Sequence, residues 1–96
     1  MPPRRSRKKK IDEYEKRFKQ VMSMLSYIGD DRTTPRNIRR SAKEALNTLT
    51  NIDQSHAVRA AQAINILDDI SQDPNMPAYT RTRIWNIVSL LEVVKE

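Results

Sequence analysis

The sequence predicts an all-α protein, a compact antiparallel four-helix bundle, from three observations. Apolar residues recur at steps of three and four along most of the chain, which is the period of an amphipathic helix. Only one glycine, Gly29, occurs among 96 residues, which leaves little for the tight turns of β-hairpins. All five prolines lie within the first three residues or at the boundaries of the apolar-periodic segments, where they interrupt no helix.

The first ten residues, MPPRRSRKKK, form a segment of their own, with six positive charges and no acid. They show no apolar periodicity, so we expect a disordered basic tail over residues 1–10. Residues 11–96 carry twelve positive and twelve negative side chains and are expected to form a single helical domain. The chain therefore reads as a neutral globular body with a basic extension.

The first helix is expected to run from about Asp12 to Ile28. Acidic residues crowd its start, and Asp12 and Glu15 have the spacing of a capping box. Gly29 follows its last apolar residue, where a glycine C-cap is expected. The apolar stripe of this helix comprises Tyr14, Phe18, Val21, Met22, Leu25 and Ile28.

Prolines and small polar residues predict where the other three helices begin. Pro35 and Pro77 suit the first position of the second and fourth helices. Asp53 or Ser55 is expected to cap the third helix. The apolar arc of that third helix is rich in alanine, which predicts a close approach to a neighbouring helix.

A shift of 42 residues aligns the two halves of the chain as a weak internal repeat. A period near 40 residues is the size of a HEAT-like helical hairpin, although any two amphipathic hairpins align almost as well. The four helices are therefore expected as a closed bundle or as two stacked HEAT-like hairpins. The matched pairs include Asp31 with Asp73, Pro35 with Pro77, and Arg39 with Arg81.

No group of residues predicts an enzyme. The chain has no cysteine and one histidine, His56, which excludes thiolate and multi-histidine metal sites. Asp53, Ser55 and His56 are the residue types of a nucleophilic triad, but near neighbours in sequence do not converge in triad geometry, so we interpret them as a helix cap with His56 in an exposed first turn. Asp69 and Asp73 are interpreted as cap and turn residues, not as metal ligands. We expect no catalytic residue, metal, cofactor or small-molecule substrate.

The sequence also argues against a membrane protein. No apolar run approaches the ~18 residues of a spanning helix. The basic start is followed by Ile-Asp-Glu-Tyr-Glu and not by the apolar stretch of a signal peptide, so we expect a cytoplasmic protein.

Two sets of cations are candidates for RNA binding. The cations of the tail are typical of a nucleic-acid-binding arm, with a solubilising tail as the alternative. The second set follows the spacing i, i+3, i+4, i+7 on the expected second helix, opposite its apolar stripe; the alternative is a solvated face flanked by Glu44. The candidate RNA-binding residues are Arg4, Arg5, Arg7, Lys8, Lys9, Lys10, Arg36, Arg39, Arg40 and Lys43.

Trp85 is the candidate for contact with a partner. It lies off the apolar stripe of the fourth helix, where it either anchors a partner, stacks on a base or packs against the flank of a neighbouring helix. The few aromatic residues favour contact with the RNA backbone over recognition of bases.

Three stretches, TPRNIRRSAKEAL, AVRAAQAINILDDISQDPNMP and RTRIWNIVSLLE, resemble the archaeal uncharacterised protein family 0147 of the UPF series. The resemblance covers roughly residues 20–96 and leaves the basic tail outside. It implies a small, all-helical, cytoplasmic protein of archaeal source. No activity and no site residue come with it.

We therefore expect a non-enzymatic RNA-binding protein, ribosomal or ribosome-associated, that contacts rRNA phosphates and has ribosomal proteins as neighbours. The alternative is a helical protein–protein interaction module, or a homo-oligomer, with no RNA role.

Overall fold

The structure is a computed structural model that describes the backbone of residues 3–95 and the side chains of residues 8–95. It contains four helices and, within residues 3–95, no strand, which confirms the expected all-α class. The helices are α1 (Pro3–Asp30), α2 (Arg36–Leu49), α3 (His56–Ile70) and α4 (Ala78–Glu92).

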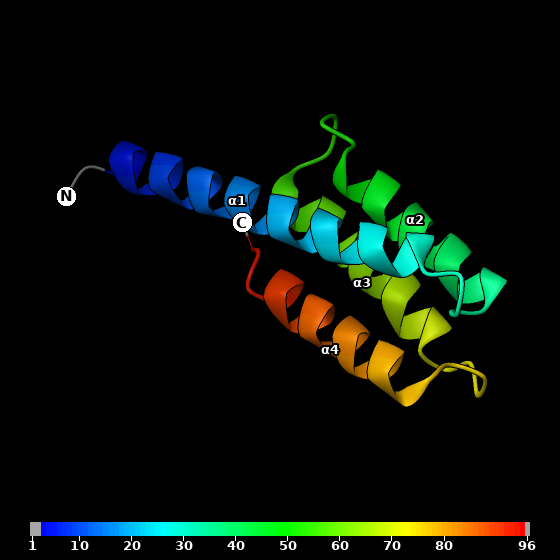
Figure 1. Cartoon of the computed structure of the whole chain (residues 1–96). Helices are drawn as coiled ribbons and strands as arrows, with labels where there is room; N and C mark the ends of the chain where they lie inside the picture. The colour runs from blue at the N-terminus through cyan, green and yellow to red at the C-terminus, as the bar shows by residue number, and fades with distance from the viewer. Residues whose placement is uncertain (1–2, 96) are drawn as a thin grey trace.

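Consecutive helices run antiparallel and close into a ring (Figure 1). α1 packs against α2 and α4, and α3 packs against the same two helices from the opposite side. The two hairpins thus share one core and form a closed bundle. The largest fully buried side chains belong to Phe18, Val21, Leu25, Ile38, Leu49, Leu67, Ile84, Ile87 and Leu91.

α2 and α3, which pack against each other, both bury alanines in the shared core. Ala60 and Ala63 are buried on α3, and Ala42 and Ala45 are buried on α2. Short side chains on both helices let the two backbones approach closely. Larger residues at these positions would overpack the interface.

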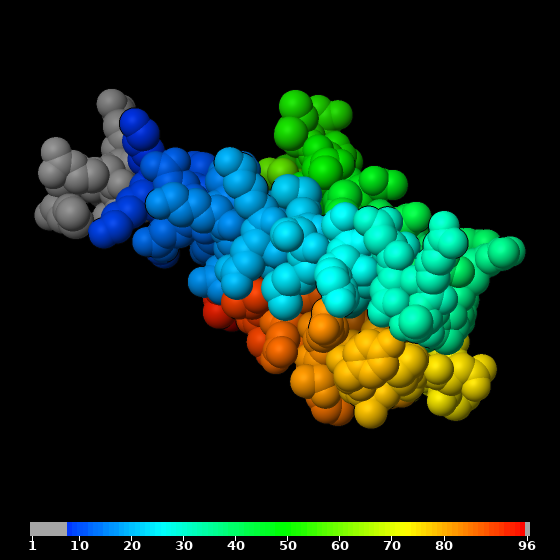
Figure 2. Space-filling model, in the orientation of Figure 1, coloured from blue at the N-terminus to red at the C-terminus, as the bar shows by residue number. Residues whose placement is uncertain are grey.

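α1 is twice as long as its partners, with 28 residues against 14 or 15. At 1.5 Å per residue it extends about 42 Å, which accounts for most of the 49 Å long axis of the molecule. Its first part therefore projects beyond the bundle as a helical arm, which we define as residues 3–13 (Figure 1). Figure 2 shows the blue, described part of this arm extending past the other helices.

The structure continues α1 as a helix through residues 3–10, where the sequence analysis expects a disordered tail over residues 1–10. The expected helix start at Asp12 is wrong for the same reason. Lysine and arginine are good helix formers, and adding a residue to an existing helix does not repeat the cost of nucleation. Pro3 occupies the first helical position, where its missing N–H leaves no bond unmade. Met1 and Pro2 lie outside the described residues.

The loops that precede α2 and α4 have the same construction. The Oδ1 atom of Asp31 accepts a hydrogen bond of 2.9 Å from the Thr33 N–H, and that of Asp73 accepts one of 2.8 Å from the Asn75 N–H. The Asx-turn that fits the turn role expected of Asp73 is thus present, and Asp31 forms a second one. A proline then caps each helix. Residues matched by the 42-residue repeat thus have matching roles.

Hydrogen bonds hold the pKa of both turn aspartates below the ordinary value. The hydroxyl of Thr33 is the main cause of the lowered pKa of Asp31, followed by the Thr33 N–H. The N–H of Asn75 is the main cause of the lowered pKa of Asp73, followed by the side-chain amide of Asn37. Each turn is therefore more stable when its carboxylate is ionised.

These lowered pKa values predict a loss of stability in acid. The stabilisation is complete above the ordinary aspartate pKa of 3.8 and is lost as the pH falls through the lower folded-state values. The double variant Asp31→Asn, Asp73→Asn keeps the turn acceptors but cannot titrate. Its free energy of unfolding, measured by urea denaturation from pH 5 to 2, should decline less steeply than that of the parent. Asp68→Asn, at an exposed carboxylate without a hydrogen bond, is the control and should follow the parent. An unchanged decline in the double variant would contradict the assignment.

Candidate nucleic-acid interface

The arm presents its described lysines to solvent. Lys8, Lys9 and Lys10 are all exposed, and no ion pair joins them to a carboxylate of residues 8–95. Three consecutive positions on a helix point in directions about 100° apart. The cations therefore surround the arm and do not lie on one side of it. The side chains of Arg4, Arg5 and Arg7 lie outside the described residues.

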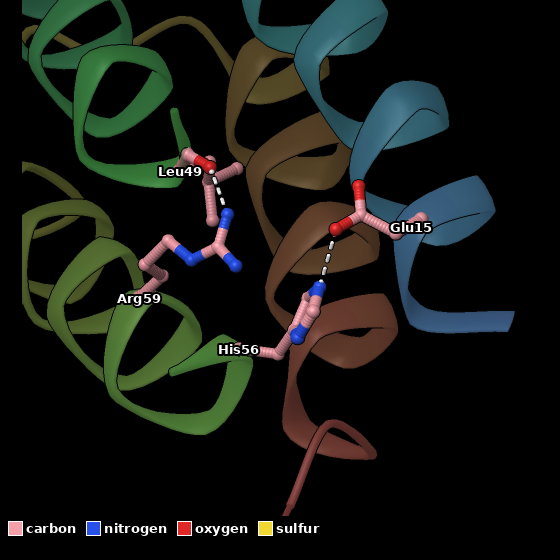
Figure 3. Close-up of polar contacts among 4 residues, drawn as sticks. All are labelled: Glu15, Leu49, His56 and Arg59. Carbon is pink, nitrogen blue, oxygen red and sulfur yellow. Dashed lines mark hydrogen bonds and ion pairs between the residues drawn. The ribbon is translucent and has the colours of Figure 1, made fainter. Parts of the chain in front are cut away.

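Contacts at the base of the arm fix the point where it leaves the bundle. The Tyr14 hydroxyl donates to the Lys95 carbonyl at 3.0 Å and so attaches the end of the chain to α1. At the next residue, Oε1 of Glu15 lies 2.6 Å from Nε2 of His56, the first residue of α3 (Figure 3). The arm is thus an extension of a helix anchored to both α3 and the C-terminal segment.

His56 belongs to this base and not to an exposed turn, which corrects the expectation. Its side chain is only 18% exposed, and its ring lies 5.3 Å from that of Phe18 and 6.0 Å from that of Tyr14, measured between centroids. The preceding Ser55 caps α3 by accepting a hydrogen bond from the Val58 N–H, as one of the two expected caps.

Arg59 is a buried cation next to the same aromatic ring. Its guanidinium lies 5.3 Å from the centroid of Phe18, and Nη1 donates to the Leu49 carbonyl at 3.1 Å (Figure 3). Leu49 is the last residue of α2, so its carbonyl has no partner within that helix. Arg59 therefore joins the end of α2 to α3 beneath α1.

The second basic set, expected as a stripe on one face of the second helix, lines a pocket together with α1. Four cations of α2 and the nearly terminal Gly29 of α1 line one open cavity of about 320 Å³. We call this the basic pocket. Three of its cations are exposed and Arg39 is half-buried. The cations are Arg36, Arg39, Arg40 and Lys43.

Gly29 does not act as the expected C-cap. Its φ is not positive, and α1 continues to Asp30. A Cβ atom at this position would lie 2.9 Å from Cγ of Lys43 and 3.2 Å from its Cε. The glycine therefore gives the lysine stem room to lie across the end of α1.

No acid neutralises the basic pocket. Within residues 8–95, its four cations form no ion pair, and no carboxylate lines the cavity. In the alternative interpretation, the acid Glu44 flanks a solvated face of cations. No ion pair in this part of the chain joins Glu44 or another acid to those cations.

The arm and the basic pocket lie far apart on α1. From Lys8 to Gly29 the helix rises 1.5 Å per residue, which separates the two regions by about 30 Å. A small anion cannot bridge that distance, whereas a polyanion with repeated charges can.

The described part of the chain contains neither a cluster of metal ligands nor a helix that could span a membrane. No group of three or more acidic, histidine or cysteine side chains gathers there to hold a metal. None of the described helices has the length and apolar character needed to cross a bilayer.

Trp85 is 58% exposed on α4, so more than half of its surface is left uncovered by the neighbouring helices. It remains available for a partner. The exposed Tyr27 of α1 also lies at the surface, with the guanidinium of Arg83 4.6 Å above its ring.

Sequence reasoning missed Glu15, His56 and Arg59 at the base of the arm. Glu15 and His56 carry no local signal, since they lie 41 residues apart. Arg59 could have been found by its spacing, because it follows the end of the preceding helix by ten residues, as Arg81 follows Ser71.

The fold and its surfaces define a small all-α protein with two separate basic regions and, within the described residues, no cluster of metal-ligating side chains. A model of the uncharacterised protein family UPF0147 matches residues 5–94, and the chain belongs to that family. The match begins at Arg5, so it includes most of the basic tail, which the resemblance had placed outside.

Relatives agree on the fold and carry no functional name. A UPF0147 protein of Sulfurisphaera tokodaii is 55% identical over 82 residues, which are 85% of this chain and 92% of the relative. The crystal structure of the unknown-function protein MMP1188 has a TM-score of 0.82 at 55% identity and covers 83% of this chain and 91% of its own. A UPF0147 protein from Thermoplasma acidophilum has a TM-score of 0.80 at 33% identity, with 84% and 95% covered.

Two arginines next to aromatic rings provide a matched test of the base of the arm. Arg59→Ala should lower the free energy of unfolding by about 2–3 kcal/mol, because it removes buried stem packing and leaves the Leu49 carbonyl without its donor. Arg83→Ala removes an exposed cation–π contact and should cost less than about 1 kcal/mol. Urea denaturation followed by circular dichroism measures both. Equal losses would contradict the role assigned to Arg59.

Proposed function

We propose that this chain is a non-enzymatic RNA-binding protein that docks on a large RNA–protein particle, with the ribosome as the particle and rRNA phosphates as the main contact. The observation that carries the proposal is the arm: a helix that leaves the bundle with a run of cations on all sides. Only the base of the arm meets the bundle, where Lys10 and Ile11 line a pocket with the start of α3, and the arm extends from there beyond the other helices.

Charge distribution supports this proposal. The six cations of residues 1–10 are the whole net charge of the chain, since the rest is balanced. Lysine and arginine that neutralise phosphates release counterions, which is the main sequence-independent source of affinity for nucleic acids. The rest of the chain has no net charge, so the largest excess of cations lies in residues 1–10.

The helical arm also supports RNA as the partner. A preformed helix loses less conformational entropy on binding than a disordered tail of the same composition. The basic pocket about 30 Å away offers a second contact on the same polyanion. Few exposed aromatic side chains are available to stack on bases, so contact with the backbone is favoured. Ribosomal proteins would be neighbours, and the location would be cytoplasmic.

The arm predicts a salt dependence that can be measured. Lys8→Gln, Lys9→Gln, Lys10→Gln keeps helix propensity and removes three cations. If each contacts a phosphate, the slope of log K against log salt for an RNA duplex should become about 3 less negative. Fluorescence anisotropy over a salt series measures the slope. Lys19→Gln, Arg32→Gln, Arg83→Gln removes three exposed cations elsewhere and should change the slope little. Equal slopes in the two variants would refute the arm as the contact.

The ribosome itself is tested by co-sedimentation. The full chain should pellet with one subunit of ribosomes from the source cells and resist moderate salt, and the lysine variant of the arm should be released at lower salt. If the full chain stays in the supernatant at low salt while it still binds RNA duplexes, the ribosome is the wrong particle.

A protein–protein interaction module or homo-oligomer is the second candidate, favoured by the exposure of Trp85. Large exposed aromatic side chains are frequent anchors of interfaces. The RNA proposal predicts one monomeric species in sedimentation velocity over a wide concentration range. A concentration-dependent dimer that Trp85→Ala abolishes would favour the second candidate instead.

A further inference from the structure

An arginine closes two of the three helix junctions in the same way. It is the fourth residue of the incoming helix, and it reaches back ten residues to the end of the preceding helix. Nη1 of Arg59 donates to the Leu49 carbonyl, and Nη1 of Arg81 donates to the Ser71 carbonyl. Nη2 of Arg81 also donates to the Asp73 carbonyl at 3.2 Å. In both, the guanidinium satisfies carbonyls that a helix end leaves free.

Arg39 occupies the corresponding position of α2 but makes no such contact. It is also the fourth residue of its helix, and the 42-residue repeat matches it with Arg81 and matches Gly29 with Ser71. No hydrogen bond or ion pair joins its side chain to the described residues, and its Nε is buried without an acceptor. The Nε of Arg59 is also buried without an acceptor. The guanidinium of Arg59 nevertheless has two contacts that Arg39 lacks, the hydrogen bond from Nη1 to the Leu49 carbonyl and the contact with the Phe18 ring.

An unpaired buried donor on a cation is costly, and an acceptor that enters the basic pocket would satisfy the Nε–H of Arg39, which has no acceptor among the described residues. Its surroundings indicate what that acceptor is. Lys43 crosses Gly29 on the same cavity, Arg36 and Arg40 lie beside it, and no carboxylate lines the site. Four unneutralised cations around one opening favour a multiply charged anion with several oxygens.

We propose that the basic pocket binds one phosphate group of the RNA, with the guanidinium of Arg39 as its central donor and Arg36, Arg40 and Lys43 around it. This inference rests on the proposed function, because it takes the RNA as the source of the phosphate. Planar guanidinium groups match phosphate oxygens with two parallel hydrogen bonds, and lysine adds a point charge. The arm then holds other phosphates of the same RNA about 30 Å away.

The Nε–H resonance of Arg39 in the full chain reports directly on the unpaired donor. Inorganic phosphate should shift this resonance in nitrogen–proton correlation spectra, whereas sodium chloride at equal ionic strength should not. The Nε–H resonances of Arg59 and Arg81 serve as internal controls and should stay in place. If phosphate and sodium chloride shifted the Arg39 resonance equally, the proposal that the basic pocket binds phosphate would be wrong.

Variants then connect the pocket to RNA. Arg39→Gln, Arg40→Gln should lower the affinity for an RNA duplex about tenfold and make the salt slope about 1 less negative. Arg32→Gln, Arg83→Gln removes the same charge outside the pocket and should leave the affinity nearly unchanged. Lys43→Gln keeps Arg39 and should give a smaller loss in the same direction, which preserves the test if the double variant does not fold.

The two proposals fail in different ways. If RNA binds with full affinity to the pocket variant but not to the lysine variant of the arm, the pocket inference is wrong and the RNA function stands. If the full chain binds no RNA at low salt, the RNA function is wrong and so is the assignment of the phosphate to RNA, even if inorganic phosphate still shifts Arg39.

Discussion

The burial of one apolar stripe on α1 is the contact on which the rest of the structure depends. Phe18, Val21, Leu25 and Ile28 are almost wholly inaccessible to solvent, and they face all the other helices. The stripe occupies only the half of α1 that three shorter helices can cover. Since those helices have 14 or 15 residues, the remainder of α1 has nothing to pack against. The core and the projecting arm therefore follow from the same mismatch in length.

Junction chemistry connects this core to the surface. At the second and third junctions an arginine satisfies the end of the preceding helix, so the charge serves folding. At the first junction the equivalent Arg39 lacks that contact, and its neighbours on the exposed side are also cations. A residue type repeated for a structural purpose thus becomes available at one position for binding. The internal repeat reveals this difference, because it matches Arg39 with Arg81, and Arg81 makes the contact that Arg39 lacks.

Much of the fold was predictable because its signals are local. The period of the apolar residues and the positions of Pro35 and Pro77 place the helices to within a residue or two at most ends. The start of α1 was not predictable, because Asp12 and Glu15 have the spacing of a capping box whether or not the helix extends further toward the N-terminus. In the candidate site, spacing alone brought the four cations of α2 to one face. The contact of Glu15 with His56 and the unpaired state of Arg39 depend on tertiary packing, which no local pattern encodes.

The arm also makes the molecule electrically asymmetric. All six uncompensated charges sit at one end of a body 49 Å long and about 20 Å wide, while the rest of the chain has no net charge. The protein therefore has a permanent electric dipole moment along its long axis. Near a polyanion this moment produces a torque before any contact forms, and the field draws the positive end forward. The molecule would arrive with the arm leading and the bundle trailing, so its first encounters would already have the orientation of the final complex.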